Sequence, residues 1–252
     1  MPRLLTDNTM ETGKIGGLQK FQFSATRTDH LGATEYTLVT IAVDETGSTS
    51  GFEDELRKSL ISAVESCKKS PRRNNLLLRV IKFSSGLANG HEEIHGFKPL
   101  ADIDTAQYPY FRPSGMTPLA DAVFSAVGAT NQYAEKLTAD DYGVNGIVIV
   151  ISDGGDNDST ATPTMIRGEI EKGVKGEHIE SLITILVGVN AQYYKTELET
   201  FKNAAGMDEY IDAGNATPSK LAKLAAFVSQ SISSQSQALG TGGPSQNIAV
   251  TI

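Results

Sequence analysis

The stretch TLVTIAVDETGSTSGF, residues 37–52, runs from seven apolar or β-branched residues directly into an aspartate. Hydroxyl side chains follow at every second position, so that Thr46, Ser48 and Ser50 come after Asp44. A continuous apolar run of this length is typical of a central strand that is covered on both faces. The stretch therefore predicts a buried strand that ends in a cluster of side-chain oxygens.

From residue 37 onward, apolar strands alternate with amphipathic helices, which predicts β-α units around a largely parallel sheet. We expect an α/β fold: a Rossmann-like, doubly wound, mostly parallel central sheet with helices on both faces. The first two helices are expected after Ser50 and after Thr117. Further strands are expected at NLLLRVIKFSS, HEEIHGFKPL, GIVIVISDGG, SLITILVGV and EYIDA, and later helices near residues 192–205 and 218–237.

The 252 residues are enough for one domain of ordinary size with a full core. We assign that domain to residues 37–237. Residues 1–36 form an N-terminal extension, in which KFQFSATRT is a candidate short strand or hairpin, and residues 238–252 form a C-terminal tail.

The charge balance argues against a nucleic-acid partner, because 30 acidic residues outnumber 22 basic ones and the net charge is −8. The single cysteine, Cys67, excludes an intramolecular disulfide and suits a reducing compartment. No apolar run has signal-peptide length near the N-terminus, and none approaches the ~20 residues of a membrane span. The sequence thus predicts a cytoplasmic protein with no nucleic-acid and no membrane partner.

Three strand-to-helix loops carry oxygens that can bind a metal ion. In a doubly wound sheet, such loops meet at the carboxyl ends of the strands. The first loop offers Asp44, Thr46 and Ser48, the second, GMTPL, offers Thr117, and the third, ISDGGDND, offers Asp153. Two carboxylates and three hydroxyls are hard ligands, which suit Mg²⁺, or alternatively Mn²⁺ or Ca²⁺, better than zinc.

Together these motifs resemble the metal-ion-dependent adhesion site (MIDAS) of von Willebrand factor A (VWA) domains, in particular those of intracellular bacterial and phage-related proteins. The shared features are D-x-T-x-S after the first strand, a threonine before proline ahead of a middle helix, and an aspartate that ends the fourth strand. They fall within residues 37–237, in the order that the family has. The sequence departs from the family at Thr46, where the usual residue is serine.

The resemblance implies that Thr46 and Ser48 bind the cation directly, and that Thr117 does so at least when a ligand is bound. It implies that Asp44 and Asp153 act directly or through water. In the family, a Glu or Asp of a partner protein completes the coordination. We therefore expect a non-enzymatic, metal-dependent adaptor or interaction module. The resemblance further implies work beside AAA+ ATPases or in stress- and phage-related assemblies, and a last helix, near 218–237, that can shift on ligand binding.

Each of these residues also has a simpler interpretation. Ser48, Ser50 or Thr117 can cap a helix, and Asp44 or Asp153 can form a turn. Capping does not require three separate loops to supply oxygen to one corner of a sheet, so the combination favours a metal site.

Two alternative functions remain open. One is a metal-dependent phosphohydrolase that uses Asp44, although Thr46 replaces the second aspartate of the usual motif; the other is a structural subunit whose metal site is unused. HEEIH, residues 91–95, matches the zinc-protease pattern H-E-x-x-H. Its place between Gly90 and Gly96 predicts a strand, which could put both histidines on one face, and not the helix that the protease requires.

Two groups of residues near these loops have simpler interpretations than a functional one. Asp156 and Asp158 belong to a solvated acidic loop, with a second cation as the alternative. Tyr108, Tyr110 and Phe111 are expected to pack in the core, with contact to a partner as the alternative.

Overall fold

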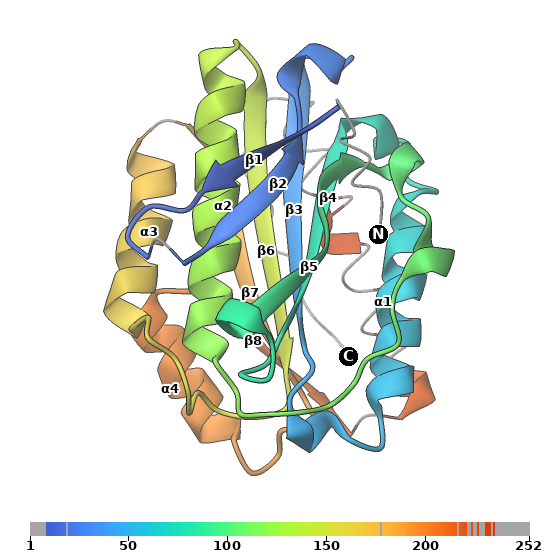
Figure 1. Ribbon diagram of the computed structural model, residues 1–252, viewed down its shortest axis with the longest axis vertical. Coiled ribbons are helices and arrows are strands. Elements are labelled where there is room, and N and C mark those ends of the chain that lie inside the picture. The colour runs from blue at the N-terminus through green and yellow to red at the C-terminus, as the bar shows by residue number, and fades with distance from the viewer. Residues whose placement is uncertain are drawn as a thin grey trace, which may run out of the picture.

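The computed structural model describes residues 9–18, 20–176, 178–215, 217–220, 223, 226, 230–232 and 234. Within them, eight strands form one sheet in the order β1-β2-β5-β4-β3-β6-β7-β8 (Figure 1). The strands are β1 (Met10–Lys14), β2 (Gln22–Thr26), β3 (Glu35–Asp44), β4 (Leu76–Phe83), β5 (His91–Pro99), β6 (Gly143–Ser152), β7 (Ser181–Val189) and β8 (Glu209–Gly214). The longer helices are α1 (Glu53–Cys67), α2 (Leu119–Ala139), α3 (Pro163–Lys175) and α4 (Lys195–Ala205).

The centre of the sheet is parallel and brings the ends of its strands to one edge. β3 lies between β4 and β6 and is parallel to both, and β7 and β8 continue the parallel order beyond β6. In this register Asp44, the last residue of β3, is level with Phe83 at the end of β4. On the other side, Val43 is level with Ile151 near the end of β6. The predicted α/β fold with a mostly parallel sheet is confirmed.

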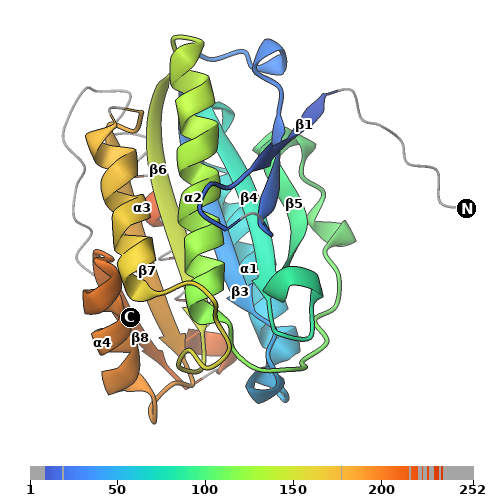
Figure 2. The ribbon, with the colours of Figure 1, turned by 60° about the vertical axis from the view of Figure 1, so that its left-hand side comes forward.

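Two hydrophobic cores lie on the two faces of the sheet. α2 packs on one face, with α3 and α4 beside it, and α1 covers the other face (Figures 1 and 2). β3 contributes to both cores: Leu38 and Ala42 belong to the core under α2, and Val39, Ile41 and Val43 to the core under α1. This alternation explains why the strand is apolar almost throughout. It also fixes the end of β3 between two packed layers.

The segment before β3 adds two strands to the sheet. β2 falls within the predicted KFQFSATRT strand and pairs with β1 in an antiparallel hairpin. Only one register pair, Ala25 with Phe97, joins β2 to β5 in the part of the chain that is described. The hairpin therefore depends on other contacts to stay on β5.

Glu93 and Gly96 of β5 supply these contacts. The Glu93 carboxylate accepts hydrogen bonds from Ser24 N (3.1 Å), from Ser24 Oγ (2.8 Å) and from Nε of the fully buried Arg79 (2.6 Å). At Gly96 an added Cβ atom would lie 2.0 Å from Ser24 O, so the approach of β2 to β5 requires glycine there.

The described residues between 218 and 234 are helical, and Ile232 packs in the core under α1. The rest of the helix predicted at 218–237 lies outside the described residues, as does the tail 238–252. Cys67 is buried at the end of α1, as expected of a structural cysteine. No helix among the residues described has the length and apolar character needed to cross a membrane.

Gly96→Ala is expected to lower the free energy of unfolding by about 2 kcal/mol, because the added methyl group collides with β2 and forces the hairpin away from β5. Urea unfolding followed by circular dichroism measures the change. Gly16→Ala is the matched control in the same hairpin, since a Cβ atom there meets nothing within 4 Å. Equal stability of the two variants would contradict this docking.

Candidate metal centre

A chain of hydrogen bonds links the ends of β3 and β6, at the lower end of the sheet in Figure 1. Ser48 Oγ donates to Asp153 Oδ1 (2.8 Å) and lies 3.0 Å from Thr46 Oγ1. Asp44 stands at the start of the same loop, close enough to Asp153 for the two charges to interact. Thr46, Asp44 and Asp153 are buried, whereas Ser48 is exposed. The first and third motifs therefore meet at one point that opens to solvent.

The carboxylate of Asp44 is held in one orientation. Its Oδ1 accepts a hydrogen bond from Thr46 N (2.8 Å), and its Oδ2 accepts one from Ser152 Oγ (2.6 Å). Ser152 also accepts a hydrogen bond from Gly154 N (3.3 Å), so it joins Asp44 to the loop after β6. Ser152, the last residue of β6, was not among the residues predicted for this site. Its position directly before Asp153 was the available signal.

Burial makes both carboxylates hard to ionise in the metal-free protein. Removal from water, followed by the charge of Asp153, raises the pKa of Asp44 to about 6. Burial likewise raises the pKa of Asp153, although the hydrogen bond from Ser48 opposes this. No basic side chain contributes to either shift among the residues described. Two carboxylates without a cationic partner favour the binding of a positive charge at this edge of the sheet.

The second motif is brought to the same place by backbone contacts. A Cβ atom placed on Gly154 would lie 3.8 Å from Thr117 Oγ1, so the Thr117 hydroxyl is next to the loop that carries Asp153. Asn157 holds the Thr117 backbone on both sides: its Oδ1 accepts from Thr117 N (2.7 Å), and its N donates to Thr117 O (3.0 Å). Within the described chain the Thr117 hydroxyl has no hydrogen-bond partner, and it is free to bind a ligand.

The helix-capping interpretation of Thr117 is wrong. α2 begins at Leu119, and its N-cap residue is Pro118, whose side chain makes no hydrogen bond to the first amides of the helix. The third loop satisfies two of these amides instead: Asp156 Oδ1 accepts from Ala120 N (3.0 Å), and Ser159 Oγ accepts from the next amide (3.0 Å). Asp156 therefore has a structural role at the start of α2, which the interpretation as a solvated acidic loop did not include.

The capping interpretation also fails at the first motif. α1 begins at Glu53, and its N-cap residue is Phe52, whose side chain makes no capping bond. Neither Ser48 nor Ser50 caps this helix. Ser48 instead donates to Asp153 across the sheet edge.

Backbone hydrogen bonds brace the loop before Thr117 against the first motif. Gly47 N donates to Gly115 O (3.1 Å), and Ser114 N donates to Glu45 O (3.0 Å). These bonds connect residues that are about seventy positions apart in the chain, and the sequence carries no local signal for them. They fix the spacing between Thr117 and the hydroxyls of the first loop.

The donor set fits a hard divalent cation. Hydroxyl and carboxylate oxygens are the ligands that Mg²⁺, Mn²⁺ and Ca²⁺ prefer, and a cation would relieve the repulsion between Asp44 and Asp153. Among the described residues, no three or more His, Cys, Asp or Glu side chains form a group that could hold a metal. A cation at this edge would therefore depend on the hydroxyls of Thr46, Ser48 and Thr117, as in the sequence-based hypothesis.

The zinc-protease pattern HEEIH lies on β5, as predicted, but its histidines do not share a face. Val80 pairs with His95 and Ile81 with Glu93, so Ile94 is an extra residue that reverses the alternation of the strand. His91 Nε2 lies 3.2 Å from Ser125 Oγ on α2, whereas His95 Nε2 lies 2.7 Å from Tyr108 OH on the other side of the sheet. The expectation that both histidines could share one face is wrong.

Both histidines are also largely enclosed, and their rings are engaged by neighbouring residues. Burial, reinforced at His91 by the charge of Arg79, lowers the pKa of His91 to about 4. Burial lowers the pKa of His95 to about 4 as well, and each ring packs against an aromatic neighbour. These are neutral core histidines.

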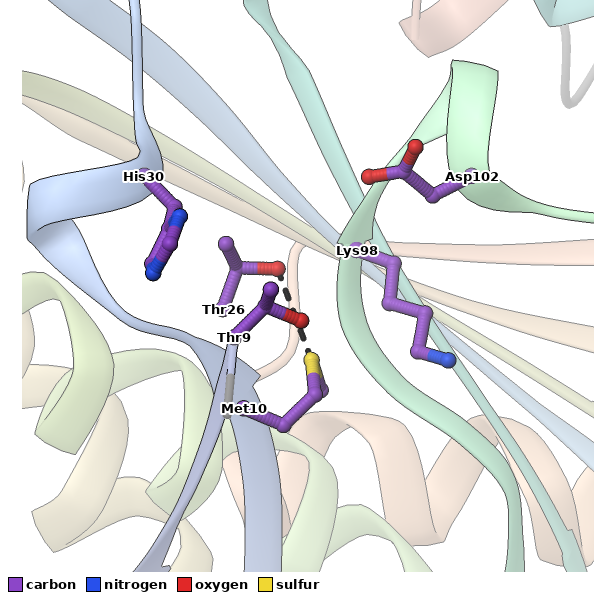
Figure 3. A pocket seen from close by; sticks show the side chains of 6 residues that line it. All are labelled: Thr9, Met10, Thr26, His30, Lys98 and Asp102. Atoms are coloured by element: carbon purple, nitrogen blue, oxygen red, sulfur yellow. Dashed lines mark hydrogen bonds between the residues drawn. The ribbon is translucent and has the colours of Figure 1, made fainter. Parts of the chain in front are cut away.

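A cavity of about 460 Å³ opens near the opposite end of the sheet (Figure 3). It is lined by Thr9, Met10, Thr26, His30, Lys98 and Asp102. Lys98 is level with Leu78 near the start of β4, far from the strand ends that carry Asp44 and Asp153. The hydrogen bond drawn between its lining residues runs from Thr26 Oγ1 to the Met10 sulfur (3.6 Å). The side chains predicted from the sequence are not among its lining residues.

Comparison with known proteins gives matches to solved structures only. No protein-family model matches the chain, and no curated protein sequence matches it. The pilus adhesin SpaC from Lactobacillus rhamnosus GG, in its open conformation, aligns with a TM-score of 0.56 at 13% identity, over 90% of this chain and 34% of SpaC. Proximal thread matrix protein 1 (PTMP1) from the mussel byssus, with a zinc-occupied MIDAS motif, aligns with a TM-score of 0.54 at 18% identity, over 78% of this chain and 46% of PTMP1.

The SpRpn10 VWA domain aligns over nearly its whole length. It has a TM-score of 0.51 at 9% identity, over 75% of this chain and 93% of that domain. This chain has a VWA-like fold. It spans about a third of the SpaC structure and just under half of PTMP1. At these identities the likeness concerns the fold alone.

The raised pKa of Asp44 predicts a pH-dependent loss of stability in the metal-free protein. A carboxyl group that holds its proton more tightly in the folded than in the unfolded chain stabilises the fold below about pH 4, and this contribution is lost as the pH rises through about 6. Two pKa units correspond to about 3 kcal/mol. Asp44→Asn, which cannot ionise, should exceed wild type in stability by part of this amount at pH 7.5 in EDTA, and should match it at pH 4.

Urea unfolding of wild type and Asp44→Asn at the two pH values measures this difference. Asp158→Asn, on the exposed part of the neighbouring loop, is the control for the loss of one acidic side chain. A stability difference between wild type and Asp44→Asn that is the same at both pH values would contradict the raised pKa.

Proposed function

We propose that this chain is a metal-dependent protein-binding module and not an enzyme. In this proposal a divalent cation, Mg²⁺ or in its place Mn²⁺ or Ca²⁺, is held by Thr46, Ser48 and Thr117. Asp44 and Asp153 contact it directly or through water. The observation that carries the proposal is the contact of Ser48 with both Thr46 and Asp153, beside a second buried carboxylate that has no basic partner among the described residues.

The chemistry of this donor set favours an acidic partner. A cation that is bound mostly by neutral hydroxyls and water keeps much of its charge, and it therefore favours an anionic ligand at an open position. Ser48 is the exposed member of the set, so the open position faces solvent. A Glu or Asp side chain of a partner protein has the charge and the reach to occupy it.

The geometry does not favour the phosphohydrolase alternative. A nucleophilic aspartate needs an oxygen that can reach a phosphorus atom. Asp44 is buried, and both of its oxygens accept hydrogen bonds, from Thr46 N and from Ser152 Oγ. An aspartate held in this way serves the metal site better than it serves covalent catalysis.

Exposed aromatic side chains around this edge support a protein partner. Among the described residues, the exposed large apolar side chains on the loops of this edge are those of Tyr110 (70% exposed), Met116 (50%), Tyr193 (90%) and Tyr194 (45%). Arg57 stacks on the Tyr110 ring at 4.5 Å and holds it in place. Exposed aromatic and Met side chains are enriched at protein interfaces. Tyr108 and Phe111, in contrast, pack in the core under α1.

We further propose a cytoplasmic context, beside an AAA+ ATPase or in a stress- or phage-related assembly. This part of the proposal rests on the resemblance of the motifs. The net charge of −8 would not attract an acidic ligand at long range, so recognition would depend on the bound cation and on the surrounding loops. A structural subunit with an unused metal site is the alternative that the following experiment separates.

Thr117→Ala is expected to abolish metal-dependent partner capture, because it removes the hydroxyl that no described residue engages and leaves the Asn157 contacts to the backbone in place. The tagged protein is used to capture partners from a lysate of the native host in Mg²⁺ or in EDTA, and bound proteins are identified by mass spectrometry. Thr117→Ser is the matched control, since it keeps the hydroxyl and should retain at least a third of the captured partner.

A partner bound by wild type and Thr117→Ser in Mg²⁺, and lost in EDTA and with Thr117→Ala, would support the proposal and identify the ligand. The same partners under every condition would mean that the metal site is not the recognition surface. In that case the structural-subunit alternative would replace it.

A further inference from the structure

The second residue of the D-x-T-x-S motif is a buried acid. Glu45 lies between Asp44 and Thr46, and only 1% of its surface is exposed. A buried carboxylate is costly unless it is paired and hydrogen-bonded. Its partners therefore reveal what the residue does.

Glu45 connects three segments at the edge of the sheet where β3 and β4 end. Its Oε2 lies 3.0 Å from Lys82 Nζ on β4, and its Oε1 accepts a hydrogen bond from Arg112 N (2.5 Å). The main chain of Glu45 makes two more contacts: its N donates to Phe83 O (2.9 Å), and its O accepts from Ser114 N (3.0 Å). The side chain and the backbone of one residue thus tie the loop before Thr117 to the ends of β3 and β4.

Glu45 does not act as a metal ligand in this arrangement. Both of its side-chain oxygens are engaged, by Lys82 and by Arg112 N. Lys82 is buried as well and also reaches Glu92 (3.4 Å), so its charge is directed at acids other than Asp44 and Asp153. The pair lies beside the site and holds two of its loops together.

A contribution to stability alone does not explain this pair. A buried ion pair is often no more stabilising than an apolar pair of the same size. An ion pair that also accepts a hydrogen bond from a backbone amide does, however, fix distance and direction more closely than an apolar contact. The segment fixed here, from Arg112 to Thr117, carries one of the three predicted hydroxyl ligands.

We propose that Glu45 is a positioning residue: it fixes the Arg112–Thr117 segment against the Asp44–Ser48 loop and thereby sets the affinity of the site for a divalent cation. This inference rests on the proposed function of these loops as a metal site. It predicts that substitutions of Glu45 and Lys82 can weaken the affinity for the cation without a matching loss of folding stability.

Glu45→Leu combined with Lys82→Met tests the separation, because the two substitutions remove both charges together and leave no unpaired buried charge. The variant should unfold within a few degrees of wild type in EDTA. Its affinity for Mn²⁺, measured by isothermal titration calorimetry well below its melting temperature, should be at least tenfold weaker than that of wild type. Glu45→Gln, which keeps an acceptor for Arg112 N, should have a Mn²⁺ affinity between those of wild type and the double variant.

Glu93→Gln is the matched control. Glu93 is likewise a carboxylate that pairs with a buried basic residue, Arg79, and accepts a backbone amide, from Ser24. The two pairs lie on opposite faces of the sheet. Arg79 alternates with Leu77 and Ile81, which face α2. Lys82 alternates with Leu78 and Val80, which face α1. Glu93→Gln should lower the melting temperature and leave Mn²⁺ affinity within twofold of wild type.

The outcomes separate this inference from the proposed function. If wild type binds no Mn²⁺, or binds it equally well after Asp44→Asn, the metal site itself is wrong. If Asp44→Asn abolishes binding but the Glu45→Leu, Lys82→Met variant binds like wild type, only the positioning role is wrong. Equal weakening by Glu93→Gln would show a general loosening of the fold and would also overturn the positioning role.

Discussion

The candidate metal site depends on one constraint, the close approach of two buried carboxylates, Asp44 and Asp153. They come from adjacent parallel strands, β3 and β6, which end at the same level of the sheet. Burial raises the pKa of both, and the charge of Asp153 raises that of Asp44 further. Ser48 and Ser152 supply hydrogen bonds where a basic residue would otherwise be expected. Such a pair opposes folding when both groups are charged and no basic residue compensates them. A bound cation would offset this cost.

The rest of the fold delivers and braces these two groups. β3 is packed on both faces, which fixes the position of Asp44 before the loop begins. Contacts between distant segments then add the remaining pieces: Asn157 holds the backbone of Thr117, and Glu45 holds the segment before it. The loops at this edge are therefore cross-linked by hydrogen bonds, and the exposed aromatic side chains stand around a site whose geometry is already set.

Much of this arrangement could be predicted from the sequence, because it depends on local patterns. Apolar runs such as TLVTIAV and SLITILVGV predicted the strands, and the ends of β3 and β6 bring Asp44 and Asp153 together. The groups that cap α2 could not be predicted, since Asp156 and Ser159 bond to its first amides from another loop. The opposite faces of His91 and His95 follow from a bulge at Ile94 that no local pattern announces. Strand β1, with the polar sequence METGK, becomes a strand through its pairing with β2.

The central claim is that three loops of this VWA-like fold form a divalent-cation site. Diffraction from crystals soaked in MnCl₂, recorded at the manganese absorption edge, tests it most directly. We predict an anomalous peak at the end of β3, in coordinating distance of the hydroxyls of Thr46 and Ser48, that is absent from crystals of Asp44→Asn. Crystals that diffract well but show no peak at this edge, or a peak only at Asp156 and Asp158, would contradict the claim.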